Sequence, residues 1–204
     1  MKTLYIVRHG QTDLNKKGII QGRGINSDLN DEGRMQAELF YKAYKNIAFN
    51  KIYISSLKRT QQSVQPFINS GIPFEKLSGL DELGWGIYEG ELPTPENRAA
   101  FHQIVIDWQS GKLDEKFEGG ESPNDVNGRQ QEALKVILSH PEEETVLVCM
   151  HGRALRLLLC TLTNKSLSEM DSFPHQNLIL YKIKYDGQNF EIIDFNNSAH
   201  LKPI

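Results

Sequence analysis

The chain contains little cysteine and no long apolar run. Its 204 residues include two cysteines, Cys149 and Cys160, both within apolar stretches, a pattern typical of reduced, buried thiols that excludes a disulfide framework. No stretch approaches the roughly 20 apolar residues of a membrane-spanning helix. The first apolar run, Leu4 to Val7, stops at Arg8 and is too short for a secretory signal. We therefore expect a cytoplasmic protein without a membrane partner.

Excess positive charge is also absent. The 23 lysines and arginines are scattered among 26 acidic residues, which gives a formal net charge of −3. Nucleic acids and acidic membranes select basic surfaces, so we expect neither as a partner. A small molecule or a protein remains. The length and the 39% of hydrophobic residues predict one globular domain over 1–204.

Apolar runs alternate with helical patterns, which favours an α/β fold with a largely parallel sheet. The expected strands are Leu4–Val7, Lys51–Ile54, a short one within Leu77–Leu83, Thr145–Met150, and an antiparallel hairpin over 178–185 and 190–195. The expected helices cover about 31–45, 57–69, 123–139 and 153–163, with another around Phe101, Val105 and Trp108. The segment of about 84–140 is predicted as a lid insertion over the edge of the sheet.

Basic side chains follow three of these strands. The strand Leu4–Val7 is followed by Arg8 and His9, the strand Lys51–Ile54 leads to Arg59, and the strand Thr145–Met150 is followed by His151. Because the carboxyl ends of parallel strands meet at one edge of a sheet, we expect these four side chains to converge. An isolated Arg-His pair is usually an ordinary surface pair, but three such strand ends predict a pocket for a dianionic phosphate group.

The residue types in this cluster suit phosphoryl transfer. Two guanidinium groups, Arg8 and Arg59, can hold the phosphoryl oxygens, and a neutral histidine can act as a nucleophile when its second nitrogen is held by a hydrogen bond. The leaving oxygen also needs a proton. Glu82 stands in a glycine-rich, acidic segment and is the candidate donor.

The motifs resemble those of a known family. Arg8-His9-Gly10 with Thr12 and Asn15 is followed by Gln21-Gly22, Ser55 to Thr60, Glu82 with Glu89-Gly90, and His151-Gly152. In this order they resemble the histidine phosphatase superfamily, in its phosphoglycerate mutase-like branch. The resemblance implies a three-layer α/β/α sandwich and chemistry without a metal or other cofactor. It also implies His9 as the residue phosphorylated during turnover, Glu82 as the proton donor, a phosphate clamp of Arg8, Arg59 and His151, and substrate contacts from Asn15, Gln21, Gly22 and Gly152.

The chain departs from the family pattern at two positions. Many members have Glu where this chain has Gln11, a change that leaves the chemistry untouched. Many also have Arg where this chain has Ile19, and that difference bears on substrate recognition. Arg23 is close in sequence, and we hypothesise that it replaces the missing cation.

Two other phosphatase classes fit poorly. A cysteine-dependent phosphatase needs five residues between the cysteine and its arginine, whereas Cys149 is separated from Arg156 by six. A metallophosphatase needs Asp and His residues at ligand spacing, which we do not find. We therefore predict a metal-independent phosphomonoester hydrolase that acts through a phosphohistidine intermediate on a small phosphorylated metabolite.

Two alternatives within the resemblance stay open. A phosphoglycerate mutase must retain a bisphosphorylated intermediate, yet residues 91–120 contain only Arg98, Lys112 and Lys116 as cations, so we expect water to be the acceptor. A non-catalytic phospho-ligand-binding module is the other alternative. The aromatic residues Trp85, Tyr88, Phe101 and Trp108 are predicted either as core of the lid or as an apolar wall for the leaving group.

Overall fold

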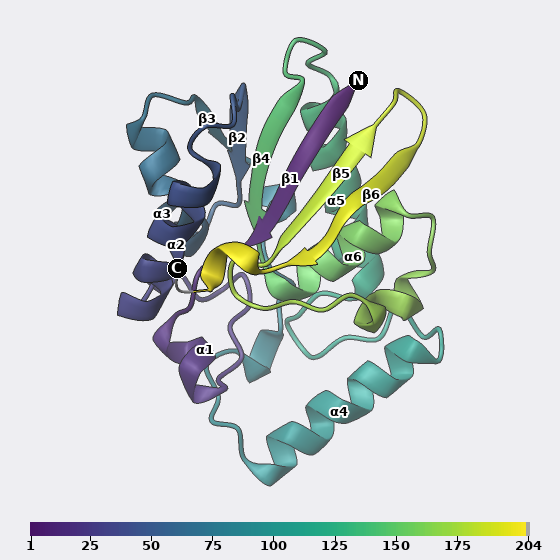
Figure 1. Cartoon of the computed structure of the whole chain (residues 1–204). Helices are drawn as coiled ribbons and strands as arrows, with labels where there is room; N and C mark the ends of the chain where they lie inside the picture. Colours follow the sequence, from purple (N-terminus) through teal and green to yellow (C-terminus); the bar gives the residue numbers. More distant parts are fainter. Residues whose placement is uncertain (203–204) are drawn as a thin grey trace.

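A six-stranded sheet forms the centre of the computed structural model, which describes residues 1–202 (Figure 1). The strand order is β3-β2-β4-β1-β5-β6. The strands are β1 (Lys2–Arg8), β2 (Lys51–Ile54), β3 (Phe74–Lys76), β4 (Thr145–Met150), β5 (Leu180–Tyr185) and β6 (Phe190–Asn197). The first four run parallel, whereas β5 pairs antiparallel with both β1 and β6. The predicted, mostly parallel sheet with a terminal antiparallel hairpin is confirmed.

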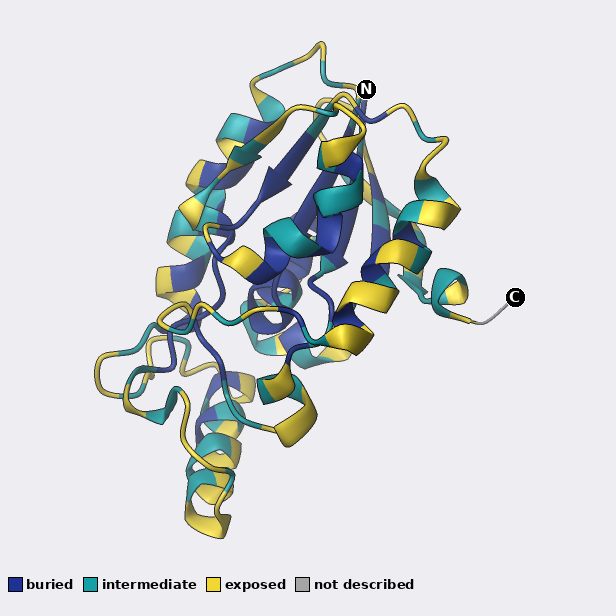
Figure 2. Ribbon diagram, turned by 90° about the vertical axis from the view of Figure 1, so that its left-hand side faces the viewer, coloured by how far each residue is buried: buried dark blue, intermediate teal, exposed yellow. Residues whose placement is uncertain are grey.

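Helices cover both faces of this sheet. Successive residues of β1 enter different cores: Leu4 and Ile6 pack with one cluster, and Tyr5 and Val7 with the other. The helices α2 (Asp31–Tyr44) and α3 (Lys58–Asn69) supply the second cluster, while α5 (Pro123–Leu138) and α6 (Gly152–Leu162) supply the first. Figure 2 shows the buried strands enclosed between these helices. The structure is the expected three-layer α/β/α sandwich.

Side-chain caps place the helix starts close to the predicted positions. Asn30 accepts a hydrogen bond from the Gly33 amide at the start of α2, and Ser122 and Asp125 form a reciprocal capping box on α5. A short helix that we did not predict, α1 (Asp13–Lys17), begins in the same way at Thr12. It ends at Gly18, whose φ of 68° is a left-handed conformation that favours glycine.

The strand predicted within Leu77–Leu83 is wrong. The strand β3 precedes that segment, and a 3-10 turn, η1 (Ser78–Leu80), occupies it. The backbone is turned at Gly79, where a β-carbon would lie only 2.5 Å from the carbonyl oxygen of Arg129 on α5. The buried leucines that suggested a strand therefore pack beneath α5 and are not part of the sheet.

The helix α4 (Pro95–Gln109) lies beyond the sheet edge at which β1, β2 and β4 end (Figure 1). The helix α5, which falls within the predicted insertion of 84–140, packs on α6 and buries apolar residues in the core of the sheet. The 3-10 turns η2 (Gly86–Tyr88), η3 (Leu167–Ser172) and η4 (Ala199–Leu201) complete the described elements. Every helix within residues 1–202 is too short or too polar to cross a lipid bilayer.

Candidate active site

The four basic side chains predicted from the strand ends meet at one point. Arg59 lies in the first turn of α3, and its Nε group donates to His9 Nε2 at 3.3 Å and to His151 Nδ1 at 3.2 Å. The two imidazole ring centres are 5.1 Å apart. His9 is 2% exposed, and Arg59 and His151 are fully buried, so water is largely excluded from around them.

A backbone contact sets the tautomer of His9. Its Nδ1 lies 2.7 Å from the carbonyl oxygen of Gly10, which can only accept, so Nδ1 carries the proton. This leaves the lone pair on Nε2, the nitrogen next to Arg59. Burial lowers the pKa of His9 well below its usual 6.5, and the charges of Arg59 and Arg8 lower it further. The ring is therefore neutral at pH 7, as a nucleophile must be.

The second histidine is held in the opposite tautomer. His151 accepts from Arg59 at Nδ1, so its Nε2 carries the proton and donates to Ser55 Oγ at 2.7 Å. Burial also lowers the pKa of His151 well below 6.5, with Arg59 as the next cause. Both imidazoles are thus uncharged, and the positive charge of this cluster comes from the arginines.

Arg8 and Arg59 form no ion pair with an acidic side chain within residues 1–202, although four other arginines do. Burial lowers the pKa of Arg59 to about 10, against which the charge of Glu82 raises it. Arg8 donates from Nη1 to the carbonyl oxygen of His175 at 2.9 Å, while its Nε has no protein partner. A buried cluster with two unpaired cations is a natural receptor for an anion.

The carboxylate of Glu82 sits at the amino end of α6, the helix that follows His151. Its Oε1 accepts from the amides of Leu83 and Ala154, each at 2.9 Å, and its Oε2 accepts from the amide of Arg153 at 3.2 Å. Its backbone is also held, because Arg129 on α5 donates to the Glu82 carbonyl oxygen at 2.9 Å. Glu82 is therefore fixed close enough to Arg8 and Arg59 for its charge to oppose the lowering of their pKa values.

The four predicted substrate-binding residues around this cluster make different contacts in the structure. Asn15 caps α1 and also accepts from Asn177, and Gln21 donates to Thr12 Oγ1 at 2.5 Å. The Gly22 carbonyl oxygen accepts from Arg59. Gly152 allows a close approach, because a β-carbon there would lie 2.5 Å from the ring of His175. These groups shape the walls of the cluster.

The loop before β5 supplies two site residues that the sequence did not predict. Asn177 donates to the His9 carbonyl oxygen at 2.9 Å, and His175 packs against Gly152. Leu178 has a φ of 51°, a strained conformation for a leucine, and it turns the chain beside Asn177. A signal did exist, because an antiparallel strand begins at the edge where the parallel strands end, so the residues before β5 must lie there.

The hypothesis that Arg23 supplies the missing cation is not supported by its contacts. Its guanidinium forms ion pairs with Glu121 at 2.8 Å and with Asp81 at 3.6 Å, so its charge is already paired with two carboxylates. The Arg23 side chain is also 40% exposed, whereas Arg59 is fully buried. Arg23 thus links its loop to the segment that carries Glu82.

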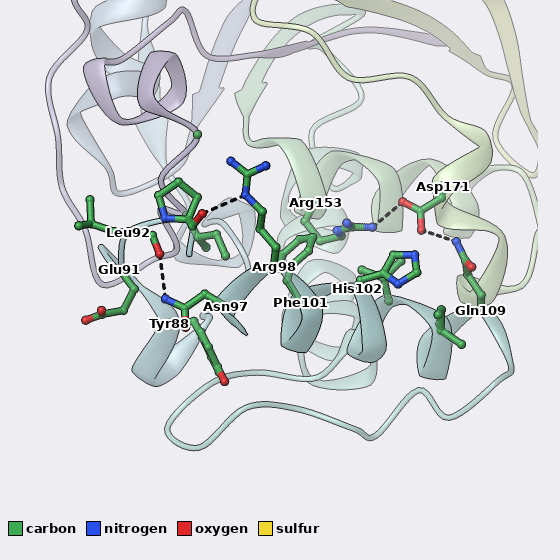
Figure 3. A pocket seen from close by; sticks show the side chains of 15 residues that line it. Tyr88, Glu91, Leu92, Asn97, Arg98, Phe101, His102, Gln109, Arg153 and Asp171 are labelled. Carbon is green, nitrogen blue, oxygen red and sulfur yellow. Dashed lines mark hydrogen bonds and ion pairs between the residues drawn. The ribbon is translucent and has the colours of Figure 1, made fainter. Parts of the chain in front are cut away.

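An apolar cavity of about 720 Å³ lies beside the cluster (Figure 3). It adjoins the cluster along two stretches of chain, because Ile20 precedes Gln21 and Arg153 follows Gly152. Most of its lining comes from α4 and from residues 88–93. Tyr88 and Phe101 line the cavity, whereas Trp85 and Trp108 are buried in the core. The aromatic set predicted as wall or core is thus divided between the two.

Possible metal ligands and thiols lie elsewhere. The one group of three potential ligands found within residues 1–202 is His140, Glu142 and Glu143, at the opposite end of the sheet, where Lys2 begins β1. Cys149 faces the core next to α3, and burial raises the pKa of its thiol well above the usual value. This agrees with the rejection of a cysteine nucleophile.

Comparisons with known proteins agree with this geometry. Residues 4–198 match the histidine phosphatase superfamily (branch 1). The chain is 32% identical to a probable phosphoglycerate mutase, GpmB, of Yersinia pestis, over 98% of this chain and 95% of that protein. It is 27% identical to phosphoserine phosphatase 1 of Hydrogenobacter thermophilus, with the same coverage.

A solved structure resembles the whole chain. YhfR of Bacillus stearothermophilus is 28% identical to it, over 99% of this chain and 100% of that one, with a TM-score of 0.86. The family match, the relatives and the fold all cover nearly the full length. The chain belongs to branch 1 of the histidine phosphatase superfamily.

Proposed function

We propose that this protein is a metal-independent phosphatase that hydrolyses a small phosphorylated metabolite through a phosphohistidine at His9. The observation that carries the proposal is the state of His9: a neutral, buried imidazole whose Nε2 is unprotonated and accepts a hydrogen bond from Arg59. A phosphoryl group bound by the two arginines would present its phosphorus to the lone pair of that nitrogen. The relatives named as phosphoserine phosphatases support hydrolysis as the reaction class.

The reaction consists of two displacements. The Nε2 lone pair of His9 attacks phosphorus, and the bond to the ester oxygen breaks with its electron pair on that oxygen. Protonated Glu82 gives the leaving oxygen its proton. Water then attacks phosphohistidine, and the Glu82 carboxylate accepts a proton from it. The bond between phosphorus and Nε2 breaks with its electron pair returning to the nitrogen, which restores His9 and releases inorganic phosphate.

The clamp consists of Arg8, Arg59 and His151, with Asn15, Gln21, Gly22 and Gly152 around it. The arginines supply their charge where negative charge spreads over the phosphoryl oxygens in the transition state. Their positions are set before substrate binds, because Arg59 also donates to the carbonyl oxygens of Ile25 and Gly22. Preorganised donors of this kind stabilise the transition state without reorganising during the reaction.

We also propose that residues 84–121, the part of the predicted insertion of 84–140 that precedes α5, form a lid over this site within a single domain. Support comes from α4 itself, which lies beyond the ends of β1, β2 and β4 and lines the cavity beside the arginines. The cations of the lid do not gather at the site. Lys112 pairs with Asp107 and Lys116 with Asp125, both at 2.8 Å on the surface.

Because the two lysines of the lid pair with carboxylates on the surface, water is favoured over a second phosphorylated metabolite as the acceptor of the phosphoryl group from His9. A mutase must hold a doubly charged intermediate, which calls for additional cations under the lid. Of the three cations in the segment, only Arg98 lines the cavity. A mutase reaction remains the alternative, because one relative is named as a probable phosphoglycerate mutase.

The test is phosphate release from a panel of phosphomonoesters in EDTA, run beside 3-phosphoglycerate with and without 2,3-bisphosphoglycerate. We expect release in EDTA, together with acid-labile phosphate on the peptide that contains His9. Loss of activity in EDTA with recovery on adding Mg²⁺ or Zn²⁺ would overturn the metal-independent chemistry. Isomerisation of 3-phosphoglycerate without phosphate release would indicate a mutase. The absence of both reactions would indicate a non-catalytic binding module.

A further inference from the structure

The cavity under α4 contains two arginines, and one of them, Arg153, already pairs with a carboxylate. Arg153 donates from Nη1 to Asp171 Oδ1 at 2.6 Å, and the same oxygen accepts from Arg156 at 2.6 Å. Figure 3 shows this Arg153–Asp171 pair at one end of the cavity, with Gln109 of α4 donating to the other carboxylate oxygen at 3.1 Å. Asp171 thus connects the lid helix to the first turn of α6.

The position of Arg153 makes this pairing important for substrate selection. Its backbone amide holds Glu82, and its guanidinium extends from there into the cavity wall, over the rings of Trp108 and Trp85 at 5.7 and 6.0 Å. A leaving group bound beside Glu82 would meet this guanidinium. Asp171 offsets part of the charge that this guanidinium presents, because the same carboxylate also pairs with Arg156.

The other residues that line the cavity provide few groups that would bind an anion. Its apolar members are Ile20, Tyr88, Leu92, Pro93, Phe101, Val105 and Ile106. Two carboxylates, Asp171 and Glu91, also line the cavity, and its other arginine, Arg98, is exposed and donates to the Pro93 carbonyl oxygen at 3.0 Å. A second anionic group on the substrate would lose its hydration here and would lie next to the carboxylate of Asp171.

We propose that Asp171 is a specificity-determining residue that holds Arg153 and thereby selects phosphomonoesters with an uncharged, largely apolar leaving group. This inference rests on the proposed phosphatase activity and adds the class of substrate. The volume of the cavity, about 720 Å³, is in the range of sites for organic ligands much larger than serine or glycerate. Substrates that carry a carboxylate near the phosphate are disfavoured by Asp171.

The experiment compares two nearly isosteric substrates, the phosphomonoesters of 4-hydroxybenzoate and of its methyl ester. We expect the wild-type protein to prefer the neutral ester in kcat/KM by about tenfold or more. In Asp171→Asn, Arg153 is free to meet the carboxylate, and we expect this preference to fall by about tenfold. Equal kcat/KM for the two esters in the wild-type protein would overturn the inference.

The matched control is Glu169→Gln. Glu169 lies on η3 with Asp171 and loses the same charge, but it pairs with Lys165 and does not line the cavity. We expect its preference to stay within about twofold of the wild-type value. If both variants shift the preference equally, the effect is one of net charge, and the assignment to Arg153 is wrong.

A second variant covers the case in which Asp171→Asn does not fold. Ile106 is 41% exposed on α4 and lines the cavity, so Ile106→Lys adds a cation there without disturbing the core. We expect the preference for the neutral ester to fall by about threefold or more. An unchanged preference would show that the leaving group does not occupy this cavity.

Failure of the proposed function has a different signature. A wild-type protein that releases phosphate from neither ester and carries no phosphate on His9 is not a phosphatase of this kind. A protein that hydrolyses both esters equally well through His9 keeps the proposed function and loses only the inference about Asp171.

Discussion

The two halves of the candidate site treat positive charge in opposite ways. In the phosphate half, Arg8 and Arg59 are unpaired within residues 1–202 and lie beside two neutral histidines. In the cavity half, Arg153 shares the carboxylate of Asp171 with Arg156. Unpaired buried cations are unfavourable until an anion arrives, whereas paired ones are satisfied in the empty protein. The first half is therefore organised for an anion and the second for a neutral group.

The largest effect is expected from the nucleophile in the phosphate half. Replacing His9→Ala removes the Nε2 lone pair, and binding by the arginines cannot compensate for it, so we expect kcat to fall by about 10⁴ or more. Phosphate release and circular dichroism measure activity and folding together. A folded variant with substantial activity would show that the phosphoryl group is transferred to another residue.

The next largest effect is expected to depend on the leaving group of the substrate. Glu82→Gln keeps the side-chain shape but cannot donate an acidic proton, so we expect kcat/KM for an alkyl phosphomonoester to fall by about 10² to 10⁴. The loss should be about tenfold smaller for 4-nitrophenyl phosphate, whose leaving group departs without a proton. Equal losses for both substrates would mean that Glu82 holds structure and does not donate the proton.

The third effect compares one arginine from each half. Arg8→Met removes an unpaired cation, so we expect kcat/KM to fall by about 10² to 10³ while the free energy of unfolding stays the same or rises. Arg153→Met leaves Asp171 with one partner fewer, and we expect it to lower the free energy of unfolding by about 1 to 3 kcal/mol.

Urea unfolding of both variants, beside the wild-type protein, tests this contrast. Similar losses of stability in the two variants would mean that Arg8 is satisfied in the empty protein, contrary to the comparison between the halves.

The phosphate half was far more predictable from sequence than the cavity half. Strand ends are local features, and the parallel topology then brings Arg8, His9, Arg59 and His151 together wherever the loops go. The pair of Arg153 and Asp171 depends instead on how η3 packs against α6, for which no local pattern exists. Asn177 was missed for a similar reason, although the antiparallel direction of β5 would have placed its loop at the site.

The error at β3 has the same origin. Short apolar runs do not distinguish a strand from a buried turn, and Leu80 and Leu83 are buried by α5 and not by strand neighbours. The packing partner of such a run is a property of the tertiary structure. Patterns with strong local causes, such as the start of the helix after Ser122, were predicted correctly.

The smallest effect lies in the pH dependence of stability, where the two halves differ in both cause and range. The pKa values of His9 and His151 lie well below 6.5 because of burial and the nearby arginines. The unfolded chain therefore takes up protons below pH 6.5 that the folded protein does not. The free energy of unfolding is highest above this pH and falls on acidification, by up to about 1.4 kcal/mol per pH unit for each such histidine.

The cavity half responds only at lower pH. Burial opposes the charged form of Asp171, but Arg153 and Arg156 bring its pKa below the ordinary 3.8, so its contribution is present above 3.8 and is lost in stronger acid. Between pH 5 and 7, we expect His9→Asn to reduce the slope of stability against pH by about one proton and Asp171→Asn to leave that slope unchanged. Urea unfolding across this range measures both slopes. A reduced slope in Asp171→Asn alone would place the acid-sensitive groups in the cavity half and reverse the contrast between the two regions.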